Sequence, residues 1–347
     1  MCGIIAILRR RSNRNVPTSE SILELLSEAT SLLGECGGQL VANEVAEAAG
    51  RVGDADRLLR GLPGLLALDR DPDLAVRVAD VLSELSIQTT TLGETLEGEP
   101  GSAEDVEAAN ATLVDLLDTT WSVARDRLGT HAGVLSMRST LTVPSDAGLG
   151  VLLSIQQALS AIDRLEVRGR DSAGIQVTVW NHGLATDDSE VLSRATDGLH
   201  RTGSVRVLEG GGLAIVFKAA AEIGELGDNT AAMRRALAND GLLARVLAAP
   251  DVQGSILGHT RWASVGLISE SNAHPVDSTR ADGVVSPLVT AVVNGDVDNY
   301  NDLVVSERLS LAPEITTDAK VVPSLCATHL SAGHDRIEAF RRTVSAF

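Results

Sequence analysis

The second residue of the chain, Cys2, carries a thiol at the position that becomes the N-terminus once Met1 is removed. We expect this removal because the second side chain is small. An α-amine titrates near pH ~8 and a thiol near ~8.5, so part of the amine is an unprotonated base at neutral pH. That base can take the thiol proton through one water, which makes Cys2 a candidate nucleophile with its own base. The alternative is a small buried hydrophobe in a first strand.

Two later segments offer groups that would complement such a nucleophile. Arg261 follows a predicted strand, and its guanidinium fork can hold a ligand carboxylate by two parallel charge-assisted hydrogen bonds. Asn294 and Gly295 follow the apolar run 289–293 and offer a side-chain amide and an accessible backbone N–H, a candidate oxyanion hole. Taken singly, Asn-Gly is also a common hairpin turn, and Arg261 could be a surface ion pair.

Four segments occur in an order that resembles the class II glutamine amidotransferases, and they are most similar to the glutaminase domain of the glucosamine-6-phosphate synthases (glutamine–fructose-6-phosphate aminotransferases). Any one segment would be weak evidence, but the four together carry the resemblance. The segments are Cys2-Gly3-Ile4, Arg168-Gly169-Arg170-Asp171-Ser172-Ala173-Gly174, Gly258 to Ala263 with Asn272-Ala273-His274-Pro275, and Asn294-Gly295-Asp296-Val297-Asp298-Asn299-Tyr300.

The resemblance implies a reaction and a role for each matching residue. Cys2 would attack the side-chain amide of glutamine, form a γ-glutamyl thioester and release ammonia, while Asn294 and Gly295 stabilise the oxyanion. Arg261 would bind the α-carboxylate of glutamine and Asp318 its α-ammonium, as a zwitterionic substrate requires. Asp318 also suits a helix N-cap.

Three further residues are assigned to the glutamine site by the same resemblance, namely Trp262, Ser264 and His274. Trp262 could act as a gate toward an ammonia acceptor or simply be a packed aromatic residue.

The chain departs from the family pattern at three positions. Val265 and Val293 stand where histidines are usual, and Arg170 stands in place of a tyrosine. These changes spare the residues to which the chemistry is assigned, but they leave an unusual acceptor open.

The favoured acceptor is fructose 6-phosphate, which would require a phosphosugar isomerase-type domain. No such domain follows before Phe347, so the chain is expected to be an N-terminal piece of a longer protein, truncated within its glutaminase domain. The sequence does not decide whether the chain forms a homo-oligomer. The competing hypothesis is a regulatory or scaffold protein that is catalytically weak and binds a partner through the helical segment described next.

The order of the predicted elements indicates an α+β fold. A first strand at 3–8 precedes a helical block, and later strands are predicted at 175–180, 205–208, 213–217, 255–259 and 289–293. The family fold is a four-layer αββα sandwich of the N-terminal-nucleophile hydrolase type. The resemblance covers 1–12 and 149–347 and leaves 13–148 as an inserted α-helical subdomain.

The net charge of −18 is concentrated in this inserted segment. Residues 13–148 contain 23 acidic and nine basic side chains, so −14 of the charge lies there. Amphipathic periodicity, as at Ile22, Leu26 and Ala29, predicts helices that form either a self-contained bundle or a docking module.

Composition also excludes several classes of protein. The acidic balance argues against a nucleic-acid binder, and no apolar run of about 18 residues predicts a membrane span. The three cysteines, Cys2, Cys36 and Cys326, show no paired spacing, and the seven histidines form no metal motif. We therefore expect a cytoplasmic protein that needs neither a metal nor a cofactor.

Overall fold

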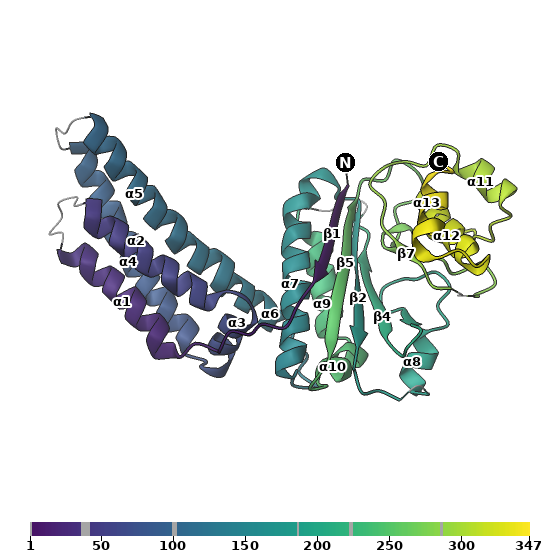
Figure 1. Ribbon diagram of the computed structural model, residues 1–347, viewed down its shortest axis with the longest axis horizontal. Helices are drawn as coiled ribbons and strands as arrows, with labels where there is room; N and C mark the ends of the chain where they lie inside the picture. Colours follow the sequence, from purple (N-terminus) through teal and green to yellow (C-terminus); the bar gives the residue numbers. More distant parts are fainter. Residues whose placement is uncertain (1, 36–41, 99–102, 186, 222–224, 285–286) are drawn as a thin grey trace. The chain divides into compact units, whose positions relative to one another are not determined.

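The chain folds into two compact units, which the computed structural model describes over residues 2–35, 42–98, 103–185, 187–221, 225–284 and 287–347 (Figure 1). One unit comprises Met1–Arg9 and Ser136–Phe347, and the other comprises Arg10–Leu135. The sequence-based division at 12/13 and 148/149 remains a prediction of domain organisation.

All regular elements described in the unit Arg10–Leu135 are helices, which follow a non-helical segment at 10–18. Helix α2 packs against α1 and α5, and α4 packs against the same two helices, around a core of leucine, alanine and valine. None of the described helices of the chain combines the length and apolar character needed to cross a membrane. The helices of this segment are α1 (Ser19–Glu35), α2 (Ala42–Leu59), α3 (Gly61–Arg70), α4 (Leu74–Gly98), α5 (Ala103–Trp121), the π-helix η1 (Ser122–Leu128) and α6 (Gly129–Ser136).

The other unit is built on a five-stranded antiparallel sheet with the strand order β1-β5-β2-β4-β3. Helices α7 and α9 pack on this sheet (Figure 1). The elements are β1 (Gly3–Leu8), α7 (Asp146–Leu165), η2 (Glu166–Arg168), β2 (Ser172–Trp180), α8 (Ser189–Arg194), β3 (Val205–Val207), β4 (Leu213–Ala219), α9 (Asp228–Ala238), α10 (Gly241–Leu247) and β5 (Gln253–Arg261).

The two faces of this sheet differ in chemistry, because side chains alternate along each strand. In β2, the apolar residues Ile175, Val177 and Val179 are fully buried on the helix side. The intervening residues of β2 are small or polar, and in register with one of them, Gly174, lie His259 of β5 and Lys218 of β4. The face turned away from α7 is therefore polar.

A second layer covers this polar face. Strands β6 (Val276–Asp277) and β7 (Thr290–Ala291) form a two-stranded sheet that packs against α12 (Val321–Ser331). A Cβ on Gly174 would lie 2.3 Å from the carbonyl oxygen of His274, so only glycine allows this close approach of the two layers. The remaining elements are η3 (Glu270–Asn272), α11 (Tyr300–Ser306), η4 (Asp318–Lys320) and α13 (Arg336–Val344).

These elements confirm the expected mixture of helices with an antiparallel sheet, while the four-layer sandwich remains a prediction. The predicted strand 3–8 is β1 exactly, and the predicted strand 255–259 extends to 253–261 as β5. The predicted strand 289–293 was too long, because only Thr290–Ala291 pairs in the described structure.

A buried cluster of ionisable side chains, comprising Asp277, Arg206, His200, Lys320 and Lys218, lies between the two layers. Asp277 Oδ2 lies 2.8 Å from Arg206 Nε and 3.0 Å from His200 Nδ1, and Asp277 Oδ1 lies 3.5 Å from Lys320 Nζ. Lys320 Nζ also donates to the backbone carbonyls of Asp277 and Thr279.

Lys218 in this cluster is 3% exposed, and its Nζ has no hydrogen-bond partner among the described residues. Burial lowers its pKa to about 7, with the nearby Lys320 and Arg206 acting in the same direction and Asp277 opposing them. Both lysines of the chain are thus buried, against the usual preference of lysine for the surface.

Replacing Lys320 by methionine should lower the free energy of unfolding by about 3 kcal/mol, because Asp277 loses one of its buried cations. Denaturant titration measures this change. The matched control is Arg280→Met, which breaks the exposed Arg280–Asp282 pair and should change the free energy of unfolding by less than about 1 kcal/mol. Equal effects of the two substitutions would contradict a stabilising role for the buried cluster.

Stability should also fall in mild acid because of His200. Burial lowers the pKa of this histidine to about 3, although Asp277 opposes the shift. Between pH ~6.5, where an unfolded histidine titrates, and pH 3, the unfolded chain binds a proton that the folded chain does not. The free energy of unfolding should therefore decrease as the pH falls through this window. The decrease should be smaller in His200→Asn, in which asparagine tolerates the positive φ of 52°. An identical pH dependence in both proteins would refute this explanation.

Candidate functional site

The pairing of β1 with β5 brings Cys2 to the end of β5. Gly3 lies opposite Thr260, and its backbone N–H donates to Thr260 Oγ1 at 3.0 Å. A Cβ on Gly3 would lie 2.7 Å from Leu165 Cδ1, so Gly3 faces the helix side of the sheet. Because successive residues alternate, Cys2 is directed to the opposite, polar face.

The thiol of Cys2 is held by the backbone of Trp262. The N–H of Trp262 donates to Cys2 Sγ at 3.4 Å, and Sγ lies 3.9 Å from the Trp262 carbonyl oxygen. Cys2 is half-buried, whereas the Trp262 side chain is 57% exposed. The sulfur is therefore fixed in place and still accessible.

Asn294 contacts the backbone of Cys2, and Gly295 follows Asn294 in the chain. Asn294 Nδ2 donates to the backbone carbonyl of Cys2 at 3.0 Å, and both Asn294 and Gly295 are exposed. The backbone N–H of Gly295 makes no hydrogen bond to the described residues, and a Cβ on Gly295 would meet nothing within 4 Å. The amide of Asn294 thus contacts Cys2, and the N–H of the next residue, Gly295, borders open space.

Arg261, the last residue of β5, is buried at the same place. Its Nη1 donates to the Leu267 carbonyl at 3.2 Å, and its Nη2 donates to the Val265 carbonyl. Burial lowers the pKa of Arg261, and Asp318 and Cys2 oppose this shift through their charges. Part of the guanidinium is therefore used to shape the following loop, and the cation lies within electrostatic reach of the thiol and of one carboxylate.

Asp318 begins η4 and is also buried. Its Oδ2 accepts the backbone N–H of Val297 at 2.6 Å. The carboxylate therefore fixes the turn that follows Asn294 and Gly295, and it lies within electrostatic reach of the cation of Arg261.

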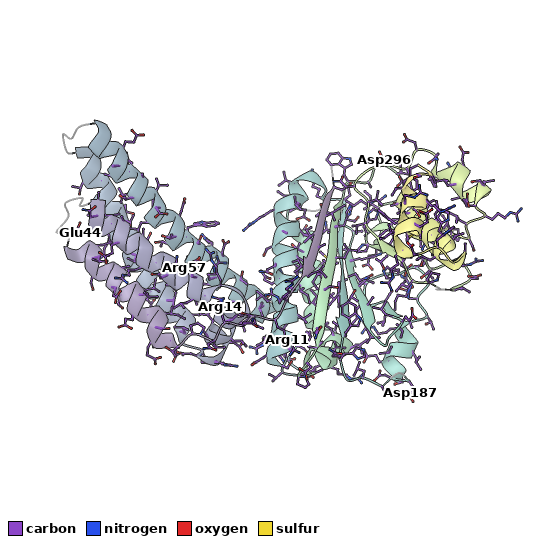
Figure 2. All side chains as sticks on the ribbon, in the orientation of Figure 1. Arg11, Arg14, Glu44, Arg57, Asp187 and Asp296 are labelled. Carbon is purple, nitrogen blue, oxygen red and sulfur yellow. The ribbon has the colours of Figure 1, made fainter. Side chains whose placement is uncertain are left out.

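The loop after β5 is anchored at three points. Asp171 Oδ2 accepts the Ala263 N–H at 2.7 Å, and Thr316 Oγ1 accepts the Leu267 N–H at 2.9 Å. The exposed Ser264 donates its hydroxyl to Asp296, which Figure 2 labels among the loops of this unit. Ser264 thus lies at the rim of the site, with its hydroxyl bonded to protein.

His274 lies behind the site and not in the open space at Gly295. It is 3% exposed, and its Nδ1 accepts the backbone N–H of Val293 at 3.4 Å. Its ring packs on that of His259, with centroids 4.3 Å apart.

Sequence reasoning missed His259, although this residue lies inside one of the quoted motifs. The alternation of side chains along β5 would have predicted its place in the site, because positions 257, 259 and 261 lie on one face of the strand, together with Arg261.

The structure therefore brings together Cys2, Arg261, Trp262, Asn294 and Asp318, with Gly295 adjacent to them. In the described ranges, no group of three or more histidine, cysteine, aspartate or glutamate side chains could hold a metal ion. Cys326 is buried in α12, and Cys36 lies outside the described residues.

Comparison with known proteins gives matches for part of the chain. It is 30% identical over 188 residues to the glutamine–fructose-6-phosphate aminotransferase [isomerizing] of Bacillus thuringiensis subsp. konkukian, a match covering 54% of this chain and 22% of that protein. It is 41% identical over 90 residues to the enzyme of the same name from a strain of Bacillus cereus, covering 26% of this chain and 14% of the relative. The corresponding Halobacterium salinarum protein is 37% identical over 87 residues, covering 25% and 14%.

The chain thus spans about a fifth or less of the length of these curated relatives. No protein-family model matches it, and no solved structure matches it. The similarity and the site geometry together indicate that part of this chain is related to the glutamine–fructose-6-phosphate aminotransferases.

Proposed function

We propose that the unit containing Cys2 is the glutaminase part of an amidotransferase, with the four-layer fold of the N-terminal-nucleophile hydrolases. The observation that carries the proposal is the convergence of Cys2, Arg261, Asn294 and Asp318 at one end of the sheet. These residues come from four segments far apart in the sequence. Hydrolysis of the side-chain amide of a zwitterion needs a nucleophile, a cation, an anion and a pair of N–H donors.

In the proposed reaction, the α-amine of Cys2, free after loss of Met1, accepts the thiol proton, and Sγ attacks the side-chain amide carbon of glutamine. Asn294 Nδ2 leaves the Cys2 carbonyl and, with the N–H of Gly295, donates to the oxyanion. The C–N bond then breaks, and the protonated amine returns its proton to the leaving ammonia. Water hydrolyses the γ-glutamyl thioester to glutamate and restores the thiol.

Substrate binding is assigned to the two buried charges. Two of the five N–H groups of Arg261 donate to loop carbonyls, and the others are proposed to pair with the α-carboxylate of glutamine. One oxygen of Asp318 accepts from Val297, and the other is proposed to accept from the α-ammonium. Trp262 and Ser264 would border the bound glutamine, and the exposed Trp262 is placed to cover the site.

The acceptor of the ammonia is proposed to be fructose 6-phosphate, in a phosphosugar isomerase-type domain of a longer protein or of a partner. The names of the relatives support this choice. The hydrogen bonds that Val265 and Val293 make within the site run through their backbone groups, so the departures at these side chains leave these bonds in place.

The nucleophile is tested by treating the mature protein with a diazo-ketone analogue of glutamine and mapping the adduct by mass spectrometry. We expect labelling at Cys2, and a loss of glutamine hydrolysis of at least about 1000-fold in Cys2→Ala. The matched control Cys326→Ala, at a buried thiol of α12, should retain both properties. Labelling at Cys36 or Cys326 instead, or no labelling of a protein shown to lack Met1, would support the scaffold alternative.

Substrate binding is tested with Arg261→Lys, which keeps the charge but loses the planar fork. Because the fork is assigned to the α-carboxylate, KM for glutamine should rise about tenfold or more, with a smaller change in kcat. The control Arg280→Lys alters an exposed arginine and should leave both constants unchanged. An unchanged KM in a folded Arg261→Lys protein would show that Arg261 only stabilises the loop after β5 and does not bind glutamine.

A further inference from the structure

We propose that His259 and His274 are positioning residues that together fix the backbone of Val293, and through it the two oxyanion donors Asn294 and Gly295. This inference rests on the proposed glutaminase function. Neither histidine needs to touch the substrate, because each acts on the residue that directly precedes the donors.

Both polar backbone groups of Val293 are bonded to a histidine ring. His259 Nε2 lies 2.9 Å from the Val293 carbonyl oxygen, and His274 Nδ1 lies 3.4 Å from the Val293 nitrogen. The other ring nitrogens, His259 Nδ1 and His274 Nε2, are buried and have no hydrogen-bond partner in the described parts of the chain. Each ring therefore directs its one side-chain hydrogen bond to the same residue.

These contacts assign the tautomer of each ring. A carbonyl oxygen only accepts, so His259 must carry its proton on Nε2. A backbone N–H only donates, so Nδ1 of His274 must be bare and its proton must lie on Nε2. Protonation of His274 would place an N–H of the ring against the N–H of Val293 and break this contact.

The electrostatic surroundings keep both rings neutral. Burial lowers the pKa of His259 to about 4, and the facing Arg261 acts in the same direction. Burial also lowers the pKa of His274 well below its ordinary value, and His259, Arg261 and Lys218 add to the effect. At neutral pH the two hydrogen bonds are therefore retained.

The sheet fixes the position of the two rings. His259 lies in the interior of β5, paired with Ile4 of β1 and Gly174 of β2. The backbone of His274 lies directly over Gly174, where a Cβ would clash with it. Through these two rings, the sheet thus fixes the position of the exposed turn at Asn294 and Gly295.

The tautomers can be measured on the wild-type protein by long-range ¹⁵N NMR of the histidine rings, with His259→Gln and His274→Asn used for assignment. We expect both rings to be neutral and protonated on Nε2 at pH 7 and pH 6. A His274 ring that is protonated on Nδ1, or charged at pH 6, would overturn the proposal whatever the enzyme activity.

The kinetic test compares substitutions that keep the required group with substitutions that lose it. His259→Gln keeps a donor at the Nε2 position and His274→Asn keeps an acceptor at the Nδ1 position, so kcat should stay within about threefold of wild type. His259→Leu and His274→Leu should lower kcat at least about tenfold, since loss of an oxyanion donor itself costs about 100-fold or more. KM for glutamine and the rate of alkylation of Cys2 by iodoacetamide should change less than about threefold.

The outcomes separate this inference from the proposed function. Wild-type kcat in both leucine variants, or equal losses in the polar and leucine variants, would overturn the positioning role while leaving the glutaminase intact. A wild-type protein that neither hydrolyses glutamine nor is labelled at Cys2 would instead refute the proposed function. If a leucine variant does not fold, the wild-type NMR measurement still decides the geometry.

Discussion

The register between β1 and β5 is the constraint on which the rest of the site depends. Gly3 opposite Thr260 sets Cys2 beside the end of β5, where Arg261 and Trp262 follow. A slip of one residue would exchange the two faces of β1 and turn the thiol toward α7. Gly3 helps to specify the register, because a larger residue there would collide with Leu165. The same pairing that builds the sheet therefore also positions the proposed nucleophile.

The polar face of the sheet is the second feature that links fold to chemistry. A face carrying His259, Arg261 and Lys218 can be buried only against a layer that supplies hydrogen bonds and counter-charges. The opposite layer supplies anions, with Asp277 within electrostatic reach of Lys218 and Asp318 within reach of Arg261. The ring of His274 packs on that of His259. The segment that carries the proposed oxyanion donors is held by polar contacts and not by an extended strand ladder, since β7 is only two residues long.

Sequence patterns predicted the strands with alternating apolar residues, because burial of one face of a strand places an apolar residue at every second position. They missed β6, since Val276-Asp277 is short and its aspartate serves the buried cluster. They also missed α2, whose buried stripe mixes the small Ala48, Ala49 and Ala55 with few larger apolar residues. The C-terminal part of α4, beyond Ile87, has a weak apolar pattern, because the buried Leu92 lies among threonine and glutamate residues.

For the site, motif order predicted the residues that converge, whereas their present hydrogen bonds could not be predicted. The bonds of Arg261 to loop carbonyls and of Asp318 to Val297 depend on tertiary packing. The central claim is that these groups surround one bound glutamine, and a crystal structure of the diazo-ketone adduct of Cys2 tests it most directly. We predict the adduct oxygen about 3 Å from Asn294 Nδ2 and the Gly295 nitrogen, the α-carboxylate on Arg261 and the α-ammonium on Asp318. An adduct on Cys2 whose carboxylate and ammonium contact neither Arg261 nor Asp318 would contradict the claim.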